Sequence, residues 1–400
     1  MPSRRYNFIL LLAALCTLLP VLLLNLLLGR YTLDDGNKAR AAAEWQRQSH
    51  GRAYLPTTGS DGLFKLARLN DELPQLNGVI FGASTAETIP TTLFPAPMKL
   101  YNYAQHGHEL HEALREAEAL LDQQPQLRWL VIPLDWSVGF LFDPRQSKPA
   151  NMARPDFDHL TTPPISLRQR LLEALSYPRI AGLAGIFRDV MRSPQPASAF
   201  RQYFLQAASD PYRCADGQWA RDFDTLYRGR CAGLAWDGSA NFAESERVGN
   251  AAPLVANALV ASSKYAGNIS RTKGEPNAEL LARVATLARR VEQRGGAVIL
   301  FMPPLLVGME QGFSQHPQYG TYLRRTKQAL GEWAQRERLV IFDAGQSERF
   351  GCVAQEFIDQ HHAVPSCYQK IWGDYWQRLA QMRDGKVHLP APGLYAGKAP

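Results

Sequence analysis

The 400-residue chain lacks two features that would have placed it in a common class. It has no internal repeat, which argues against a repeat architecture. It also lacks a dense basic stripe: the net charge of +7 is mild, and beyond Arg289-Arg290 and Arg324-Arg325 no Lys/Arg block stands out. Nucleic-acid binding needs a denser basic surface with interleaved aromatics, so we expect no nucleic-acid partner. A solvated surface facing anionic lipid or envelope polymer accounts for the charge.

Cysteine is scarce, with five residues. Cys16 lies inside an apolar run and matches a lipoprotein cleavage site poorly. The other four form two local pairs, Cys214 with Cys231 and Cys352 with Cys367. An even number of closely spaced cysteines suggests disulfides in an oxidising compartment, each worth about 3 kcal/mol for loops of this size. The alternative is four unrelated buried thiols.

A cleavage site is also missing where a secretory leader would have one. Residues 8–28 are almost entirely apolar and, as a helix, span about 31 Å, which matches a bilayer core. The nearest small-x-small site, at residues 39–41, lies far downstream. Arg4 and Arg5 keep the N-terminus inside by the positive-inside tendency. We therefore predict an uncleaved anchor with the body outside, and a cleaved leader is the alternative.

Apolar runs alternate with amphipathic segments over the rest of the chain. Strands are predicted at 77–82, 98–101, 129–132, 297–302 and 339–342, and helices at 107–123, 278–294 and 318–336. Strands that are apolar throughout, separated by such helices, predict an α/β fold with a mainly parallel sheet covered on both faces.

The predicted organisation has an anchor at 1–30, a juxtamembrane linker and short helix at 31–70, and a catalytic domain at 71–380. The last residues, 381–400, are expected to be a flexible tail. Between about 138 and 275 the alternation stops, and Pro, Arg and aromatic residues become frequent. We interpret this stretch as a mainly helical insertion above the substrate-binding edge of the sheet, or as a partner-docking platform.

Two short motifs carry the candidate chemistry. Ser84 follows the first strand, and Asp359-x-x-His362 lies near the C-terminus. Serine becomes a nucleophile when a histidine takes its proton and a carboxylate orients that histidine. Both motifs follow strands of a parallel sheet, whose carboxyl ends form the active-site edge. The backbone N–H of Ser84 and that of Gly107, placed at a helix start, are candidate oxyanion donors.

This order of elements resembles the SGNH (GDSL-like) serine hydrolase superfamily over residues 76–140 and 296–375. Gly82-Ala83-Ser84 resembles its first block, and Asn102 followed by Gly107 is similar to the second. Asp359 and His362 match the last block. The resemblance implies a three-layer sandwich, a Ser-His-Asp triad without cofactor or metal, and an oxyanion hole that includes Gly107.

The chain departs from the family at two positions. Ala83 replaces an aspartate that does no chemistry. The third block normally supplies an asparagine side chain to the oxyanion hole, but the equivalent residue here is Asp135. Losing one such donor costs about 3–4 kcal/mol of transition-state binding. Asn102 and Asp135 are candidate site-lining residues, and Asp135 could act only if protonated or through another group.

With an anchor and an outward body, the chain looks most like envelope acyl-transfer members of the superfamily. That resemblance implies a serine acyltransferase or esterase on the outer face of a bacterial inner membrane, acting on an O-acetyl or D-alanyl group. Its substrate would be a cell-envelope polysaccharide or similar polymer, and its partner a membrane-bound acyltransferase. The triad does not separate transfer from hydrolysis.

Two other classes stay open. A metal site can be drawn from His106, His108, His361, His362 and Asp359. The other alternative is a catalytically silent envelope protein that binds glycan or a membrane acyltransferase.

Overall fold

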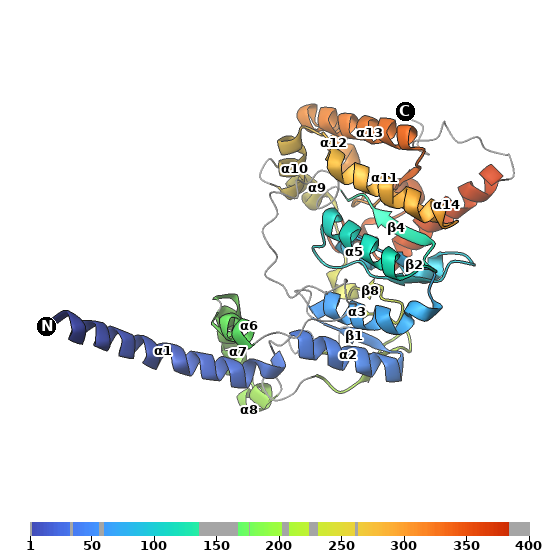
Figure 1. Cartoon of the computed structure of the whole chain (residues 1–400). Helices are drawn as coiled ribbons and strands as arrows, with labels where there is room; N and C mark the ends of the chain where they lie inside the picture. The colour runs from blue at the N-terminus through green and yellow to red at the C-terminus, as the bar shows by residue number, and fades with distance from the viewer. Residues whose placement is uncertain are drawn as a thin grey trace. The chain divides into compact units, whose positions relative to one another are not determined.

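The computed structural model describes residues 2–32, 35–55, 60–135, 167–175, 177–201, 208–223, 231–260 and 263–383 (Figure 1). The chain forms two units. The first comprises Met1–Ala67, Ala153–Asp156 and Thr162–Arg230, and the second comprises Arg68–Met152, Phe157–Thr161 and Cys231–Pro400. The predicted tail from residue 384 onward lies outside the described residues.

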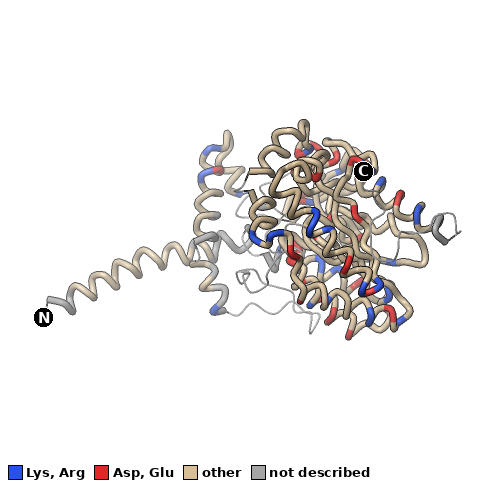
Figure 2. The backbone as a smooth tube through the Cα atoms, turned by 90° about the horizontal axis from the view of Figure 1, so that it is seen from above, with Lys and Arg blue, Asp and Glu red and all other residues tan. Residues whose placement is uncertain are grey.

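The first unit begins with one long apolar helix. Helix α1 (Pro2–Thr32) contains the window Tyr6–Leu23, with a mean hydropathy of 2.3 and no residue buried. Figure 2 shows this stretch free of charged residues. By length and composition the helix is able to cross a membrane, as an anchor or as a signal sequence. Helix α1 contacts helices α6 (Leu167–Ala174) and α7 (Tyr177–Arg192).

The rest of the first unit contains short elements. Helix α2 (Asp35–Ser49) precedes strand β1 (Arg52–Tyr54), which pairs in parallel with β6 (Trp219–Asp222). Strand β5 (Tyr212–Arg213) pairs antiparallel with β6, and α8 spans Pro196–Phe200. We predicted a linker with one helix at 31–70 and a mainly helical insertion at 138–275. The strands were missed because runs of two to four residues show no periodicity.

The second unit is built on a five-stranded sheet. Its strands are β2 (Gly78–Ile80), β3 (Leu100–Asn102), β4 (Trp129–Pro133), β9 (Ala297–Met302) and β10 (Ile341–Asp343). They lie in the order β10-β9-β4-β2-β3, and every neighbouring pair is parallel. The predicted α/β fold with a parallel sheet is therefore confirmed.

Long helices accompany this sheet. Helices α5 (Leu110–Gln123) and α11 (Ala278–Gln293) contact each other, and α11 contacts β9 (Figure 1). Helix α14 (Pro365–Arg383) follows the Asp-x-x-His motif, and its buried Trp372 packs against Phe301 of β9 and Phe342 of β10.

The other elements are α3 (Ser60–Glu72), α4 (Ser84–Glu87), β7 (Gly233–Leu234), β8 (Ala240–Asn241), α9 (Ala252–Ala258), α10 (Lys264–Thr272), α12 (Met309–Gln315) and α13 (Pro317–Glu337). Short 3-10 turns cover Leu73–Gln75, Thr91–Leu93, Glu244–Glu246, Ser347–Phe350 and Ala354–Glu356.

The strand order places a candidate site. After β2 the chain forms β3 on one side, and it then crosses to β4, β9 and β10 on the other. The order therefore reverses between β2 and β4, and open parallel sheets bind ligands beyond the carboxyl ends of the strands at such a point. Ser84 follows β2 and Asp135 follows β4, so both lie at this position.

All four cysteines of the two predicted pairs are disulfide-bonded. Cys352 and Cys367 are bonded with Cα atoms 5.2 Å apart. Cys214 and Cys231 are disulfide-bonded as well. The first bond closes the segment that contains Asp359 and His362. Both disulfides fit a body that folds outside the reducing cytoplasm.

Candidate active site

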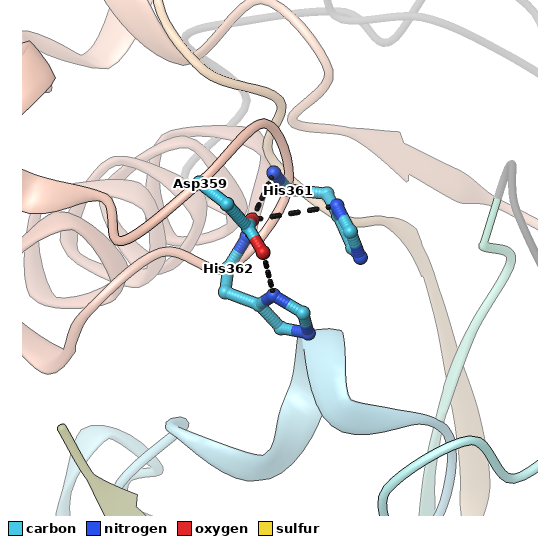
Figure 3. Close-up of side chains that lie close together, drawn as sticks. All are labelled: Asp359, His361 and His362. Atoms are coloured by element: carbon cyan, nitrogen blue, oxygen red, sulfur yellow. Dashed lines mark hydrogen bonds and ion pairs between the residues drawn. The ribbon is translucent and has the colours of Figure 1, made fainter. Parts of the chain in front are cut away.

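Asp359 organises the C-terminal motif (Figure 3). Its Oδ1 accepts hydrogen bonds from the backbone N–H groups of His361 at 2.8 Å and His362 at 2.9 Å. Its Oδ2 lies 2.6 Å from His362 Nδ1. Asp359 and His362 are three positions apart. This spacing lets one carboxylate bind the turn and still reach the imidazole. The carboxylate therefore fixes both the position and the ring orientation of His362.

Burial acts to raise the pKa of Asp359, but the hydrogen bond from His362 and the charges of His361 and His362 outweigh it. The net effect lowers the pKa of this carboxyl well below its ordinary value. Asp359 is therefore ionised at neutral pH, the state that stabilises an imidazolium in a catalytic triad.

The imidazole of His362 also reaches the serine. His362 Nε2 lies 2.7 Å from Ser84 Oγ, across 278 positions of sequence. With Nδ1 held by Asp359, the tautomer that leaves Nε2 free to accept the hydroxyl proton is favoured. Ser84 and His362 are both largely buried, with 8% and 11% of their surfaces exposed. The predicted residues Ser84, His362 and Asp359 thus meet in the geometry of a general-base triad.

The turn before Ser84 depends on a glycine. Gly82 has a φ of +133°, and a Cβ there would lie 2.2 Å from Cγ of Pro133 on β4. Phe81 donates its N–H to the carbonyl of Val131, which continues the β2–β4 pairing into the turn. Only glycine allows this approach, so the turn places Ser84 at the first residue of α4.

Two hydrogen bonds connect the serine segment with the histidine segment. Thr88 Oγ1 donates to the carbonyl of Ala363 at 2.6 Å, and the Tyr368 hydroxyl donates to the carbonyl of Thr85. All four groups are buried. These bonds hold Ser84 and His362 in register independently of the bond between them. No sequence motif marks Thr88 or Tyr368, because their partners lie about three hundred positions away.

Asn102 holds the backbone that follows the nucleophile, and its side chain does not line the site. It is fully buried, and its Nδ2 donates to the carbonyls of Ala86, Glu87 and Ile89 at 2.9–3.1 Å. Its Oδ1 accepts from the N–H of Ala104. The Nδ2 group therefore holds the segment from the end of α4 to Ile89, and Oδ1 holds the backbone that follows β3. The prediction of Asn102 as a site-lining residue is replaced by this structural role.

Two backbone groups remain as candidate oxyanion donors. The N–H groups of Ser84 and Gly107 make no hydrogen bond to another described residue. Gly107 has a φ of +67° and is exposed, in a turn before α5. The helix was predicted to start at Gly107, but it begins at Leu110 because Glu109 and Glu112 form a capping box there.

Asp135 lies next to the nucleophile, as predicted, and it is buried. Its Oδ2 accepts a hydrogen bond of 2.6 Å from Thr85 Oγ1, the residue directly after Ser84. An ionised carboxylate is an acceptor only. Asp135 therefore anchors Thr85, and in its ionised form it does not supply the donor that an asparagine would provide.

Aromatic rings from the 231–275 segment flank the histidines. The Phe242 ring centroid lies 6.0 Å from that of His362, and the Tyr265 ring lies 5.4 Å from that of His361. The two imidazoles are themselves 4.0 Å apart. The sequence predicted an insertion near the site but did not identify these two residues, since a single aromatic residue in a loop or short helix gives no signal.

The groups considered for a metal site are only partly brought together. The ligand atoms of Asp359, His361 and His362 lie within 4.8 Å of one another (Figure 3). His108 is turned toward Glu116, with Nε2 3.1 Å from its carboxylate, and His106 is exposed. The hydrogen bonds from His362 to Asp359 and Ser84 occupy both of its ring nitrogens, which favours the triad over a metal site.

No protein-family model matches the chain, and no curated protein or solved structure is significantly similar to it.

Proposed function

We propose that this protein is a membrane-anchored extracytoplasmic serine acyltransferase or esterase that acts on an O-acyl group of a cell-envelope polymer. The observation that carries the proposal is the position of the His362 imidazole, 2.7 Å from Ser84 Oγ and 2.6 Å from Asp359. A buried serine with this pair of partners is equipped for attack on an ester carbonyl.

The chemistry follows from the three side chains. Ser84 Oγ attacks the acyl carbon while its proton moves to Nε2 of His362. The tetrahedral intermediate then collapses, the proton passes to the leaving alcohol oxygen, and the acyl group stays on Ser84. An acceptor hydroxyl next gives its proton to His362 and attacks the acyl-serine, which releases the acylated acceptor and restores Ser84. When water is the acceptor, the same steps complete ester hydrolysis.

Location and architecture support an envelope substrate. The apolar helix α1 and the two disulfides fit an anchored body outside the cytoplasm. The strand order, with helices between the strands, supports a three-layer SGNH-like sandwich. Outside the apolar stretch of α1, Figure 2 shows Lys/Arg and Asp/Glu interspersed over the described residues, which is consistent with a polymer or lipid surface as neighbour. A membrane-bound acyltransferase is the proposed source of the acyl group.

One feature favours a silent, glycan-binding protein as the second candidate. Asp135 stands where the SGNH pattern has an oxyanion-hole asparagine, and it is hydrogen-bonded to Thr85. A negative charge there opposes an oxyanion, so a protein that only binds would tolerate this residue.

Labelling with a fluorophosphonate separates the candidates. This reagent phosphonylates an activated serine and releases fluoride. The full chain in detergent micelles should be labelled, and both Ser84→Ala and His362→Ala should not be. Labelling that is absent from the wild-type chain supports the silent protein. Ester hydrolysis that persists in Ser84→Ala and stops with a chelator supports a metal centre at Asp359, His361 and His362.

A further inference from the structure

Tyr265 carries a buried hydroxyl that makes no hydrogen bond to any described residue. It lies in the first turn of α10, whose N-cap Ser263 accepts from the N–H of Ala266. Its ring packs edge-on against His361 at 5.4 Å and against Phe313 at 6.4 Å. Buried tyrosine hydroxyls usually have a partner, because an unpaired one is costly. A ligand that supplies an acceptor here would remove that cost.

Tyr265 lies next to the histidines of the candidate active site. Its ring contacts His361, whose ring in turn lies 4.0 Å from that of His362. Burial raises the pKa of Tyr265 well above its ordinary value, and the charges of Asp135 and Asp359 raise it further. Both carboxylates belong to the candidate site, since Asp359 binds His362 and Asp135 binds Thr85. The phenol therefore keeps its proton and stays a hydrogen-bond donor.

The reaction needs such a donor. Ser84 and Gly107 offer backbone N–H groups, but the side-chain donor of the third block is missing because Asp135 is an acceptor. We propose that the Tyr265 hydroxyl donates a hydrogen bond to the ester carbonyl oxygen as it becomes an oxyanion, in place of that asparagine. This inference rests on the proposed serine chemistry. No proton is transferred in the step: the phenol keeps its hydrogen, and the negative charge stays on the substrate oxygen until the intermediate collapses.

The test is p-nitrophenyl acetate hydrolysis by the full chain in detergent micelles. Tyr265→Phe removes the hydroxyl and keeps the ring against His361. Loss of one oxyanion donor lowers kcat by about 10²–10³-fold. We expect that loss with a KM within about twofold of the wild-type value and a melting temperature no lower than that of the wild-type chain.

Tyr101→Phe is the matched control. The Tyr101 hydroxyl is also buried without a partner among the described residues. Burial raises the pKa of Tyr101, the charge of Arg68 lowers it, and the charges of Asp237, Glu72 and Asp71 raise it. Unlike the pKa of Tyr265, it is not shifted by Asp135 or Asp359. We expect Tyr101→Phe to hydrolyse the ester at the wild-type rate.

The outcomes separate this inference from the proposed function. A wild-type chain no faster than Ser84→Ala overturns both. An active wild-type chain with an equally active Tyr265→Phe overturns the Tyr265 donor alone. If Tyr265→Phe is slow but the midpoint of its kcat/KM–pH profile has also moved, Tyr265 positions the histidines and the donor role is wrong. A slow variant with an unmoved midpoint supports the donor.

Discussion

Asn102 is the residue whose removal should disturb the nucleophile without touching it. Its amide holds the carbonyls of Ala86, Glu87 and Ile89, and its oxygen accepts from Ala104. In Asn102→Ala each of these four buried groups loses one hydrogen bond.

The size of the effect follows from that count. A buried polar group left without a partner costs about 1–3 kcal/mol, and carbonyls with a second lone pair fall at the low end of that range. Together with the cavity, we expect Asn102→Ala to lose about 3–5 kcal/mol. For domains of about 150–250 residues each kcal/mol lowers the melting temperature by about 2–4 °C, so a fall of about 10 °C is expected.

Asn77→Ala is the control for this measurement. Asn77 also makes two side-chain bonds, to the carbonyl of Pro97 and from the N–H of Lys99, both at 2.8 Å. These bonds are exposed to water, which replaces the lost partner, so the loss should stay near 1 kcal/mol. Thermal melts of the full chain in micelles compare the two variants. A melting temperature of Asn102→Ala within about 2 °C of that of Asn77→Ala would refute the reasoning.

Three further predictions concern the triad and its support. His362→Ala should lower ester hydrolysis by at least about 10³-fold with the fold intact, whereas His361→Ala should lower it far less; equal losses in rate assays would contradict the assignment. Because the folded-state pKa of Asp359 is depressed, its stabilising contribution is present above about pH 4 and is lost as pH falls further. The melting-temperature difference between the wild-type chain and Asp359→Asn should therefore be present at pH 5 and shrink below about pH 4; a difference at pH 5 that does not shrink down to about pH 2 would contradict the role of the carboxylate. Replacing Cys352 and Cys367 by serine should destabilise the chain by about 3 kcal/mol and lower the hydrolysis rate, because the disulfide closes the segment that carries the histidine; melts and rates equal to those of the wild-type chain would contradict that.

The sequence was sufficient to predict the sheet strands and the triad. Runs such as Val79–Phe81 are apolar throughout, and Asp-x-x-His has a spacing that lets one carboxylate bind the turn and the ring. In a parallel sheet the carboxyl ends converge on one edge, so Ser84 and His362 were expected to meet although they lie far apart in the chain.

The supporting contacts were not predictable in the same way. Asn102 resembles a family motif, yet its amide binds the backbone at Ala86, Glu87, Ile89 and Ala104, which only the three-dimensional arrangement reveals. Tyr368 and Thr88 bind partners about three hundred positions away, and Tyr265 gives no local pattern that sets it apart from other aromatic residues. Long-range side-chain hydrogen bonds leave no periodic signal in a sequence, whereas strands and amphipathic helices do.

The most direct measurement of the central claim is peptide mapping by mass spectrometry after the full chain has reacted with p-nitrophenyl acetate and been quenched in acid. The account predicts one acetyl group, located on the peptide that contains Ser84 and missing from Ser84→Ala. An adduct confined to other residues, or no adduct on a chain that hydrolyses the ester, would contradict a covalent mechanism at Ser84.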